Sequence, residues 1–171
     1  MPAIRNYLSV VGDVQEVERF QEAAWGRMPL NPSSIGLLPP EQSLCFHSLV
    51  PLPSEYSTVP YKDGSENSGN NMEIKTWGVE WGALNLDIPI RAFPNVLTYK
   101  FDTAWNPPIV FLNKAAQKWP KLRFFLSWGG EGPELERMLF DNEKATQIIK
   151  DINMVEVLFP YREVMDRWIN V

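Results

Sequence analysis

Cys45 and His47 are the cysteine and the histidine of the chain, which has one of each. They stand two residues apart, and on a strand such side chains point to one face, where a thiol and an imidazole could meet as nucleophile and base. This chemistry also needs a third group that orients the base, and no nucleophile-elbow or cysteine-protease signature accompanies the pair. We therefore expect ordinary packing for both side chains and predict no catalytic residue.

Carboxylates are the second candidate for chemistry, because Glu80, Asp87 and Asp102 lie close to aromatic blocks. Paired carboxylates can hold a divalent metal or transfer protons. Asp87 and Asp102 fall on the expected polar faces of neighbouring strands, which favours solvated surface charge. The single cysteine and histidine exclude a Cys-ligated iron–sulfur cluster, a zinc ribbon and a His-rich metal site. The chain also has no phosphate-binding glycine motif, so we predict neither a metal nor a cofactor.

The tryptophans Trp77, Trp81 and Trp105 form the third group. One interpretation is structural, in which they close the end of a sheet beneath a helix. The other is an exposed aromatic patch that anchors a partner, because tryptophan is enriched at interface hot spots. The residues predicted to contact a partner are Trp77, Glu80, Trp81, Asp87, Asp102 and Trp105.

Length, net charge and the distribution of apolar residues limit the classes of protein to which the chain can belong. The chain has 171 residues, which suits one domain, and a formal net charge of −5. An acidic chain lacks the basic face of a broad nucleic-acid footprint, and it also falls far short of the dense carboxylate surface of a DNA mimic. The first residues do not have the pattern of a signal peptide, and no run of 18 apolar residues is present, so we expect a cytoplasmic protein.

The N-terminal part predicts a strand, a helix and an irregular insert. Residues 6–11 are aromatic and β-branched, as in a strand. Asp13 is an expected N-cap with Glu16 completing a capping box. The expected buried face of the helix is formed by Val14, Val17, Phe20, Ala24 and Trp25. The insert at about 27–73 is rich in proline, and residues 43–50 within it fit either a strand or a short buried element.

Within the insert, residues 63–71 read Asp-Gly-Ser-Glu-Asn-Ser-Gly-Asn-Asn. Glycine, serine and asparagine dominate turns and surface loops, so this segment is the expected mobile loop.

In the second half of the chain, apolar and polar residues alternate over two segments. Residues 84–90 and 97–101 each place apolar side chains at every second position, which predicts two antiparallel strands joined by a turn at 93–95. A helix is expected from an N-cap at Asn106 to the stop at Pro120. Residues 122–128 predict another strand, with 134–140 as its hairpin partner.

The last thirty residues predict helices, and the first of these helices has one face formed by Ala145, Ile148, Ile149 and Ile152. The order strand–helix–insert–strand–strand–helix–strand is the split βαβ, or ferredoxin-like, arrangement of an α+β protein, with two helices on one face of an antiparallel sheet. We assign residues 1–141 to this domain and residues 142–171 to a helical extension packed on it.

Three blocks resemble a known family. They are Trp-Gly-Val-Glu-Trp at 77–81, Phe-Asp-Thr-Ala-Trp-Asn-Pro-Pro at 101–108, and Trp-Pro-x-Leu-x-Phe at 119–124. They are similar to the YubB-like ferredoxin-like domain of uncharacterised bacteriophage and plasmid proteins, over about residues 74–140. The resemblance implies a mobile-element accessory protein in a bacterial cytoplasm, and it supplies no reaction.

The functional expectation is a non-enzymatic protein that binds a host protein, in its sharpest form an inhibitor of a bacterial defence system of the anti-CRISPR or anti-restriction type. Such complexes carry basic nucleic-acid channels, which an acidic protein can occupy by charge complementarity. One alternative is a nucleic-acid-binding module on the open face of the sheet, because Phe124 and Phe125 resemble the stacking aromatics of RNA-binding sheets. The other is an enzyme with an unrecognised site. We expect the activity to lie in residues 51–72 and the C-terminal helices.

Overall fold

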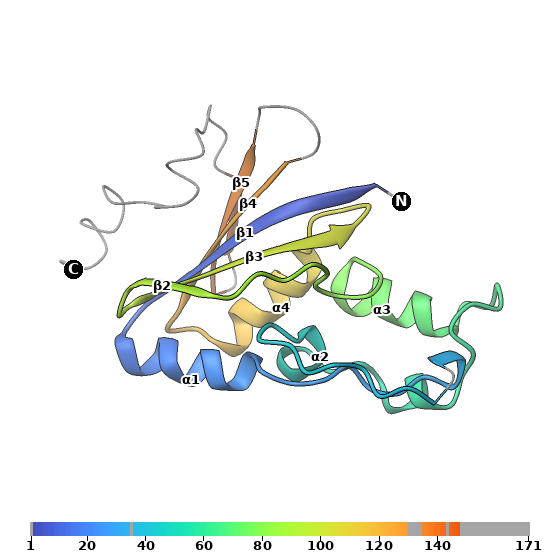
Figure 1. The fold of residues 1–171 in the computed structure, drawn as a ribbon. Coiled ribbons are helices and arrows are strands. Elements are labelled where there is room, and N and C mark those ends of the chain that lie inside the picture. The colour runs from blue at the N-terminus through green and yellow to red at the C-terminus, as the bar shows by residue number, and fades with distance from the viewer. Residues whose placement is uncertain (1, 35, 130–134, 143, 148–171) are drawn as a thin grey trace.

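The computed structural model describes residues 2–34, 36–129, 135–142 and 144–147. One antiparallel sheet forms one layer of the molecule (Figure 1). Its strands are β1 (Ala3–Val11), β2 (Ile90–Phe93), β3 (Val96–Ala104), β4 (Arg123–Gly129), β5 (Glu136–Asp141) and β6 (Lys144–Gln147). Their order across the sheet is β2-β3-β1-β4-β5-β6. The first four strands in this order make the predicted ferredoxin-like sheet, and the fold class is thereby confirmed.

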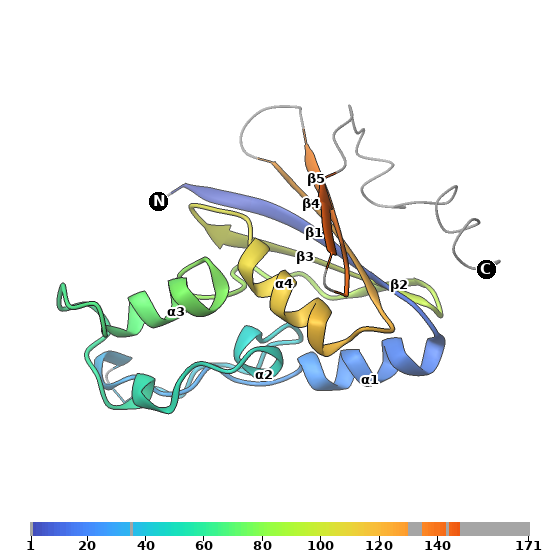
Figure 2. The same ribbon diagram turned by 180° about the vertical axis from the view of Figure 1, so that it is seen from behind.

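The helices cover one face of this sheet, as Figures 1 and 2 show from opposite sides. They are α1 (Val14–Ala24), α2 (Phe46–Leu49), α3 (Gly69–Trp77) and α4 (Ile109–Lys118), with 3-10 turns at Pro32–Ser34 and Ser54–Ser57. Among the helices of the described residues, none has the length and apolarity needed to cross a membrane.

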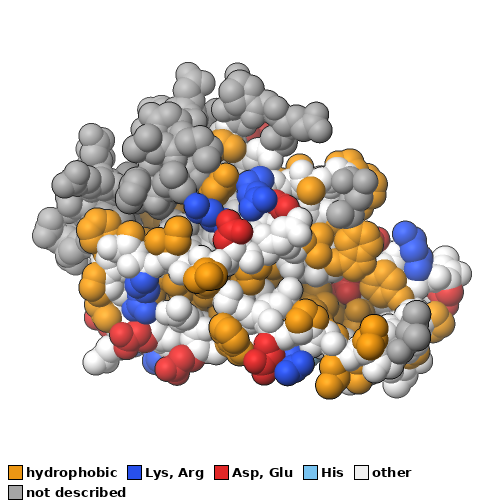
Figure 3. Space-filling view, viewed as in Figure 1, with side chains coloured by type: hydrophobic (Ala, Val, Ile, Leu, Met, Phe, Trp, Pro, Cys, Tyr) orange, Lys and Arg blue, Asp and Glu red, His pale blue; other side chains and the backbone are white. Residues whose placement is uncertain are grey.

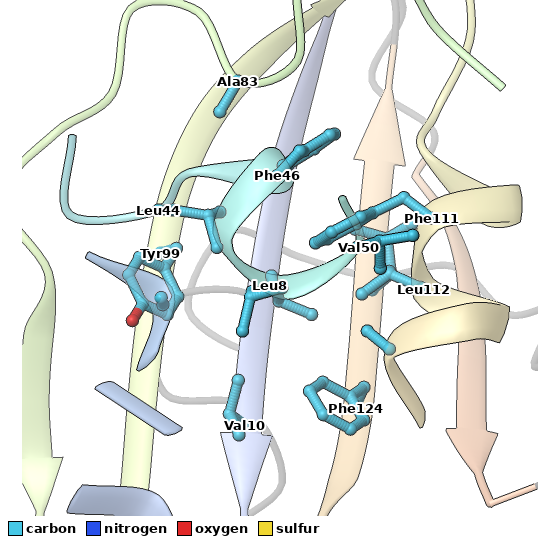
Figure 4. Packing of buried hydrophobic residues seen from close by; sticks show 14 of the residues in the cluster. Leu8, Val10, Leu44, Phe46, Val50, Ala83, Tyr99, Phe111, Leu112 and Phe124 are labelled. Carbon is cyan, nitrogen blue, oxygen red and sulfur yellow. The ribbon is translucent and has the colours of Figure 1, made fainter. Parts of the chain in front are cut away.

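The core lies between the sheet and the helices (Figure 4). Register places Leu8 of β1 between Tyr99 of β3 and Leu126 of β4, so one row of side chains spans three strands. Phe46 of α2 stacks on Phe111 of α4 with ring centroids 3.8 Å apart. The insert therefore contributes to the core of the domain through α2.

Helix α1 begins as predicted, because the Asp13 carboxylate accepts the backbone N–H of Gln15. Glu16 pairs with Arg19. The prediction that Trp25 is buried was wrong: the helix ends at Ala24, the backbone of Trp25 is extended, and its side chain is 56% exposed.

The predicted strand at 84–90 was also wrong for most of its length. Leu84 makes an isolated bridge with Asp102, and regular pairing returns only at Ile90, where β2 begins. Asn85 has φ 46°, a left-handed conformation that interrupts an extended strand. Ile88 is 88% exposed, so the alternation does not mark a buried face here.

Three other boundaries differ. Helix α4 has Pro108 rather than Asn106 at its N-cap, while the Asn106 carbonyl accepts the Thr103 hydroxyl. The expected loop at 63–71 contains the start of α3, and Ser68 is buried. Residues 144–147, expected in a helix, form β6. The remaining expected C-terminal helices, at 148–171, lie outside the described residues.

Candidate partner-binding site at the Trp81 and Trp105 end of the sheet

The chain leaves α3 through a tight connection at residues 78–85. Gly78 ends the helix with φ 79°, and its N–H bonds the carbonyl of Ile74. A Cβ at Gly78 would lie 2.9 Å from the Val110 side chain, so close packing as well as conformation favours glycine there. Trp81 and Gly82 follow with φ 67° and 65°.

Trp81 and Trp105 lie at the same end of the sheet. The backbones of Leu84 and Asp102 exchange hydrogen bonds of 2.8 and 2.7 Å, which fixes an antiparallel register. Trp81 precedes Leu84 by three residues and Trp105 follows Asp102 by three, so this antiparallel bridge places both tryptophans toward the same end of the sheet.

Both tryptophans are exposed and strained. Trp81 is 39% exposed and Trp105 is 54% exposed. Trp105 has φ 68°, close to the φ of Trp81. A bulky residue in the left-handed region costs about 1–3 kcal/mol and is held there only by its surroundings. For Trp105 these include the bond from its N–H to the carbonyl of Pro2, 3.0 Å long.

A buried carboxylate holds the backbone of Trp81 from beneath. Glu73 of α3 is 1% exposed and accepts hydrogen bonds from the Tyr56 hydroxyl, the Tyr61 hydroxyl and the Trp81 N–H, at 2.8, 2.9 and 2.8 Å. Burial raises the pKa of Glu73, these three donors oppose the rise, and the nearby charge of Glu80 adds to it. The same burial, together with Glu73, raises the pKa of both tyrosines.

A second polar group fixes the start of α3 beside this carboxylate. Glu80 is 9% exposed, and its Oε1 accepts the Asn70 side-chain amide at 3.3 Å. The Ser68 hydroxyl bonds Asn70 Oδ1 at 2.6 Å. The amide of Asn31 donates to the carbonyls of Tyr56 and Val59, which ties the two halves of the insert together.

Asp102 lies on the opposite face of β3 from the core. It pairs with Arg5, directly across from it on β1, with Nε and Oδ1 2.8 Å apart. Its other oxygen accepts the Asn85 amide at 2.8 Å. Asp102 is 7% exposed, so the prediction of a solvated charge was wrong, whereas Asp87 is exposed as expected.

Among the predicted contact residues, Trp77 is the tryptophan that the fold withdraws from the surface, and Glu80 and Asp102 are buried as well. It is fully buried, its indole N–H donates to the Val50 carbonyl at 2.8 Å, and its ring meets Phe46 edge-on. The structural interpretation therefore holds for Trp77, while Trp81 and Trp105 remain available to a partner.

The Cys45 and His47 pair does not sit on a strand. Cys45 is fully buried at the N-cap of α2. His47 Nδ1 accepts the Leu52 N–H at 3.0 Å, and burial lowers the pKa of this imidazole. Both side chains thus contribute to packing around α2.

Exposed aromatic and recessed acidic groups occur together at this end. Figure 3 shows hydrophobic side chains gathered over α3 and the neighbouring insert, with acidic side chains recessed between them. The sequence did not single out Glu73, Tyr56 or Tyr61. A carboxylate within a short polar helix such as α3 gives no signal of burial, because the donors that satisfy it come from distant residues.

The far face of the sheet, which the nucleic-acid alternative requires, is a mixed surface. Cross-strand neighbours on it include Tyr7, Lys100 and Ser127. Phe125 also belongs to this face but is 2% exposed, and Phe124 is fully buried on the core face. The two phenylalanines therefore point to opposite sides, and neither offers an exposed ring to a base.

Comparison with known proteins agrees with this architecture. Residues 76–154 match the model of a family described as the ferredoxin-like domain in Api92-like protein. The crystal structure of a protein Api92 from Yersinia pseudotuberculosis superimposes with a TM-score of 0.66 and 8% identity, covering 88% of this chain and 99% of that chain. At this identity the likeness concerns the fold. No curated protein matches the sequence. Over residues 76–154 the chain is therefore similar to the ferredoxin-like domain found in Api92-like proteins.

Proposed function

We propose that this chain is an accessory protein of a phage or related mobile element that binds a protein of its bacterial host. The proposed target is a defence complex of the CRISPR or restriction type, and the proposed action is inhibition by binding rather than by catalysis. The observation that carries the proposal is the pair of exposed, strained tryptophans at one end of the sheet.

Trp81 and Trp105 have the properties of interface anchors. Large aromatic side chains dominate binding energy at interfaces, and a single hot-spot residue contributes about 2 kcal/mol or more. Both rings are held at unfavourable backbone angles, with φ 67° and 68°. Such strain clusters at functional positions, where the surroundings keep a side chain in place for its role.

The net negative charge of the chain supports a partner that has a basic surface. The chain carries a net charge of −5, and the exposed Asp87 lies six residues after Trp81. An acidic surface with aromatic anchors is complementary to a basic channel that normally holds nucleic acid. The buried Glu73 supports a structural rather than a catalytic role, because three donors already occupy its carboxylate.

The experiment is a plating assay. The chain is expressed in bacteria with or without a CRISPR or restriction system, and phage plating efficiency is measured. We expect plating to rise at least about tenfold only in the defended cells, with a purified complex retaining the protein at physiological salt. Loss of one hot-spot contact of about 2 kcal/mol corresponds to roughly thirtyfold in affinity, so Trp81→Ala and Trp105→Ala should abolish the rise.

Trp25→Ala is the matched control. Trp25 is 56% exposed on the end of α1 and has ordinary φ of −74°. This variant should protect phage as well as the wild type does. Protection that falls equally in all three variants, or no protection across a panel of defence systems, contradicts the proposal.

Nucleic-acid binding is a second candidate, favoured by basic and aromatic side chains on the far face of the sheet. Arg5, Tyr7 and Lys100 lie there on adjacent strands and are at least partly exposed. A gel-shift series with single- and double-stranded DNA and RNA tests it. Binding that weakens as salt rises, and that Lys100→Gln reduces, supports this candidate, whereas no shift at low salt removes it.

A further inference from the structure

A hollow of about 490 Å³ lies on the helix side of the molecule, between α3, α4 and residues 50–53. It is separate from the Trp81 and Trp105 site. Its lining is Val50, Pro51, Leu52, Pro53, Thr76, Lys114, Gln117 and Lys118. A mostly apolar lining with a few charged and amide groups is the usual composition of a binding site.

Two lysines are held at this hollow by the ends of helices. Lys114 Nζ donates to the carbonyls of Lys75 and Thr76 in the last turn of α3, at 3.1 and 2.8 Å. Lys118 Nζ donates to the carbonyl of Leu49, the last residue of α2, at 3.3 Å. An ammonium group has three N–H donors, so each lysine keeps at least one donor for a ligand.

These ammonium groups have no carboxylate neighbour within ion-pair distance in the part of the chain that the structure describes. The ion pairs found there all use arginine. Two cations without a carboxylate partner, four residues apart on α4 in a chain of net charge −5, form a local positive site. An anionic ligand would complete the charge balance.

The floor of the hollow is apolar and continues into a second hollow of about 510 Å³. Val50 and Leu52 are 4% and 5% exposed, so they present a packed surface rather than mobile side chains. Pro53 and Thr76 line both hollows, so the two hollows adjoin, and together they are called the groove below. Lys75 lies along the second part, together with Glu55 and Glu66.

We propose that this groove binds an extended acidic polypeptide segment. Its carboxylates pair with Lys114 and Lys118, and its alternate apolar side chains lie on Val50, Leu52 and Pro53. An open groove that runs through two hollows suits a chain better than a compact metabolite. Beyond Thr76 the glutamates favour neutral or apolar residues of the peptide.

The test uses the full chain and a fluorescein-labelled peptide of alternating glutamate and leucine, followed by fluorescence anisotropy. A lysine–leucine peptide of the same length is the charge-reversed control. We expect saturable binding of the acidic peptide that weakens as salt rises, and no comparable binding of the basic one. Inorganic phosphate at matched ionic strength should fail to displace the peptide.

Lys114→Gln with Lys118→Gln should lower affinity at least about tenfold. Because these lysines also bond helix ends, Gln117→Glu serves as a second variant: Gln117 is exposed on the same groove, and a new negative charge there should weaken binding without removing those bonds. Lys144→Gln on β6 removes one charge elsewhere and should bind normally. The proposal is overturned by unchanged affinity in both groove variants, by equal binding of the basic peptide, or by full displacement with phosphate. None of these outcomes depends on Trp81 or Trp105.

Discussion

The carboxylate of Glu73 accepts the backbone N–H of Trp81 across 2.8 Å. One partner is 1% exposed and the other 39% exposed, so a buried ionisable group positions an exposed aromatic residue. Tyr56 and Tyr61 bond the same carboxylate. The insert, α3 and the surface at Trp81 are therefore connected by hydrogen bonds. A substitution at Glu73 should alter the position of Trp81 at the binding site.

Glu73→Gln should flatten the dependence of stability on pH. Burial raises the pKa of Glu73 above its ordinary value of 4.5, so just above that pH the folded protein keeps a proton that the unfolded chain has released. Wild-type stability therefore falls as pH rises through the window between the two pKa values. Urea unfolding from about pH 4.5 to about pH 7.5 should show this fall in the wild type and lose it in the variant.

The control for this experiment is Glu66→Gln, which changes an exposed carboxylate of the same insert. It should keep the wild-type slope. Equal slopes for wild type and Glu73→Gln would falsify the inferred coupling between burial and protonation.

Trp105→Asn should separate stability from binding. Asparagine adopts the left-handed conformation far more readily than tryptophan, and Trp105 has φ 68°. Relief of strain offsets the lost partial burial, so we expect the free energy of unfolding to change by less than about 1 kcal/mol, while phage protection is lost. Trp105→Val, with a β-branched side chain at the same φ, should be less stable than Trp105→Asn in urea; the reverse order would show that this backbone is not strained.

The sequence predicted the strands where side-chain pattern and backbone pairing agree. Residues 97–101 alternate and lie within β3, with Leu97 and Tyr99 facing the core. Residues 84–90 alternate just as well, yet Asn85 takes a positive φ, Leu84 makes only an isolated bridge with Asp102, and β2 begins only at Ile90. Periodicity describes the side chains alone, so it cannot reveal a left-handed residue that ends a ladder.

The candidate site was only partly predictable for a different reason. Trp81 and Trp105 stand out by residue type, but the burial of Glu73 depends on Tyr56 and Tyr61, which lie 17 and 12 residues away. These contacts form only when the insert folds back along α3. The local composition of the insert indicated a loop, because glycine, serine and asparagine are typical of turns. The same residue types can also begin a helix and bond buried carboxylates, and composition does not distinguish these roles.

Phe46→Ala should show that the insert belongs to the core. Phe46 is 1% exposed, stacks on Phe111, and meets Trp77 and Phe101 edge-on at 5.7 and 6.0 Å. Loss of a buried phenylalanine costs about 3–5 kcal/mol, because it leaves a cavity among rigid rings. Urea unfolding should remain a single transition at lower midpoint. Leu37→Ala, at an insert residue that is 74% exposed, should change stability little; a second, separate transition in Phe46→Ala would instead mean that the insert folds independently.

Tyr99→Phe should stabilise the protein. The hydroxyl of Tyr99 (labelled in Figure 4) is buried and has no hydrogen-bond partner among the described residues. Its ring packs edge-on against Phe20 with centroids 6.5 Å apart. An unsatisfied buried hydroxyl costs about 1–3 kcal/mol, and phenylalanine keeps the ring contacts without it, so the free energy of unfolding should rise by about 1 kcal/mol. Tyr56→Phe is the matched opposite case, because the Tyr56 hydroxyl donates to Glu73 at 2.8 Å. Loss of this hydrogen bond should lower the free energy of unfolding by about 1.5–3 kcal/mol. The two variants should therefore move the urea midpoint in opposite directions, and a shift of the same sign in both would mean that the Tyr99 hydroxyl has a stabilising partner in solution.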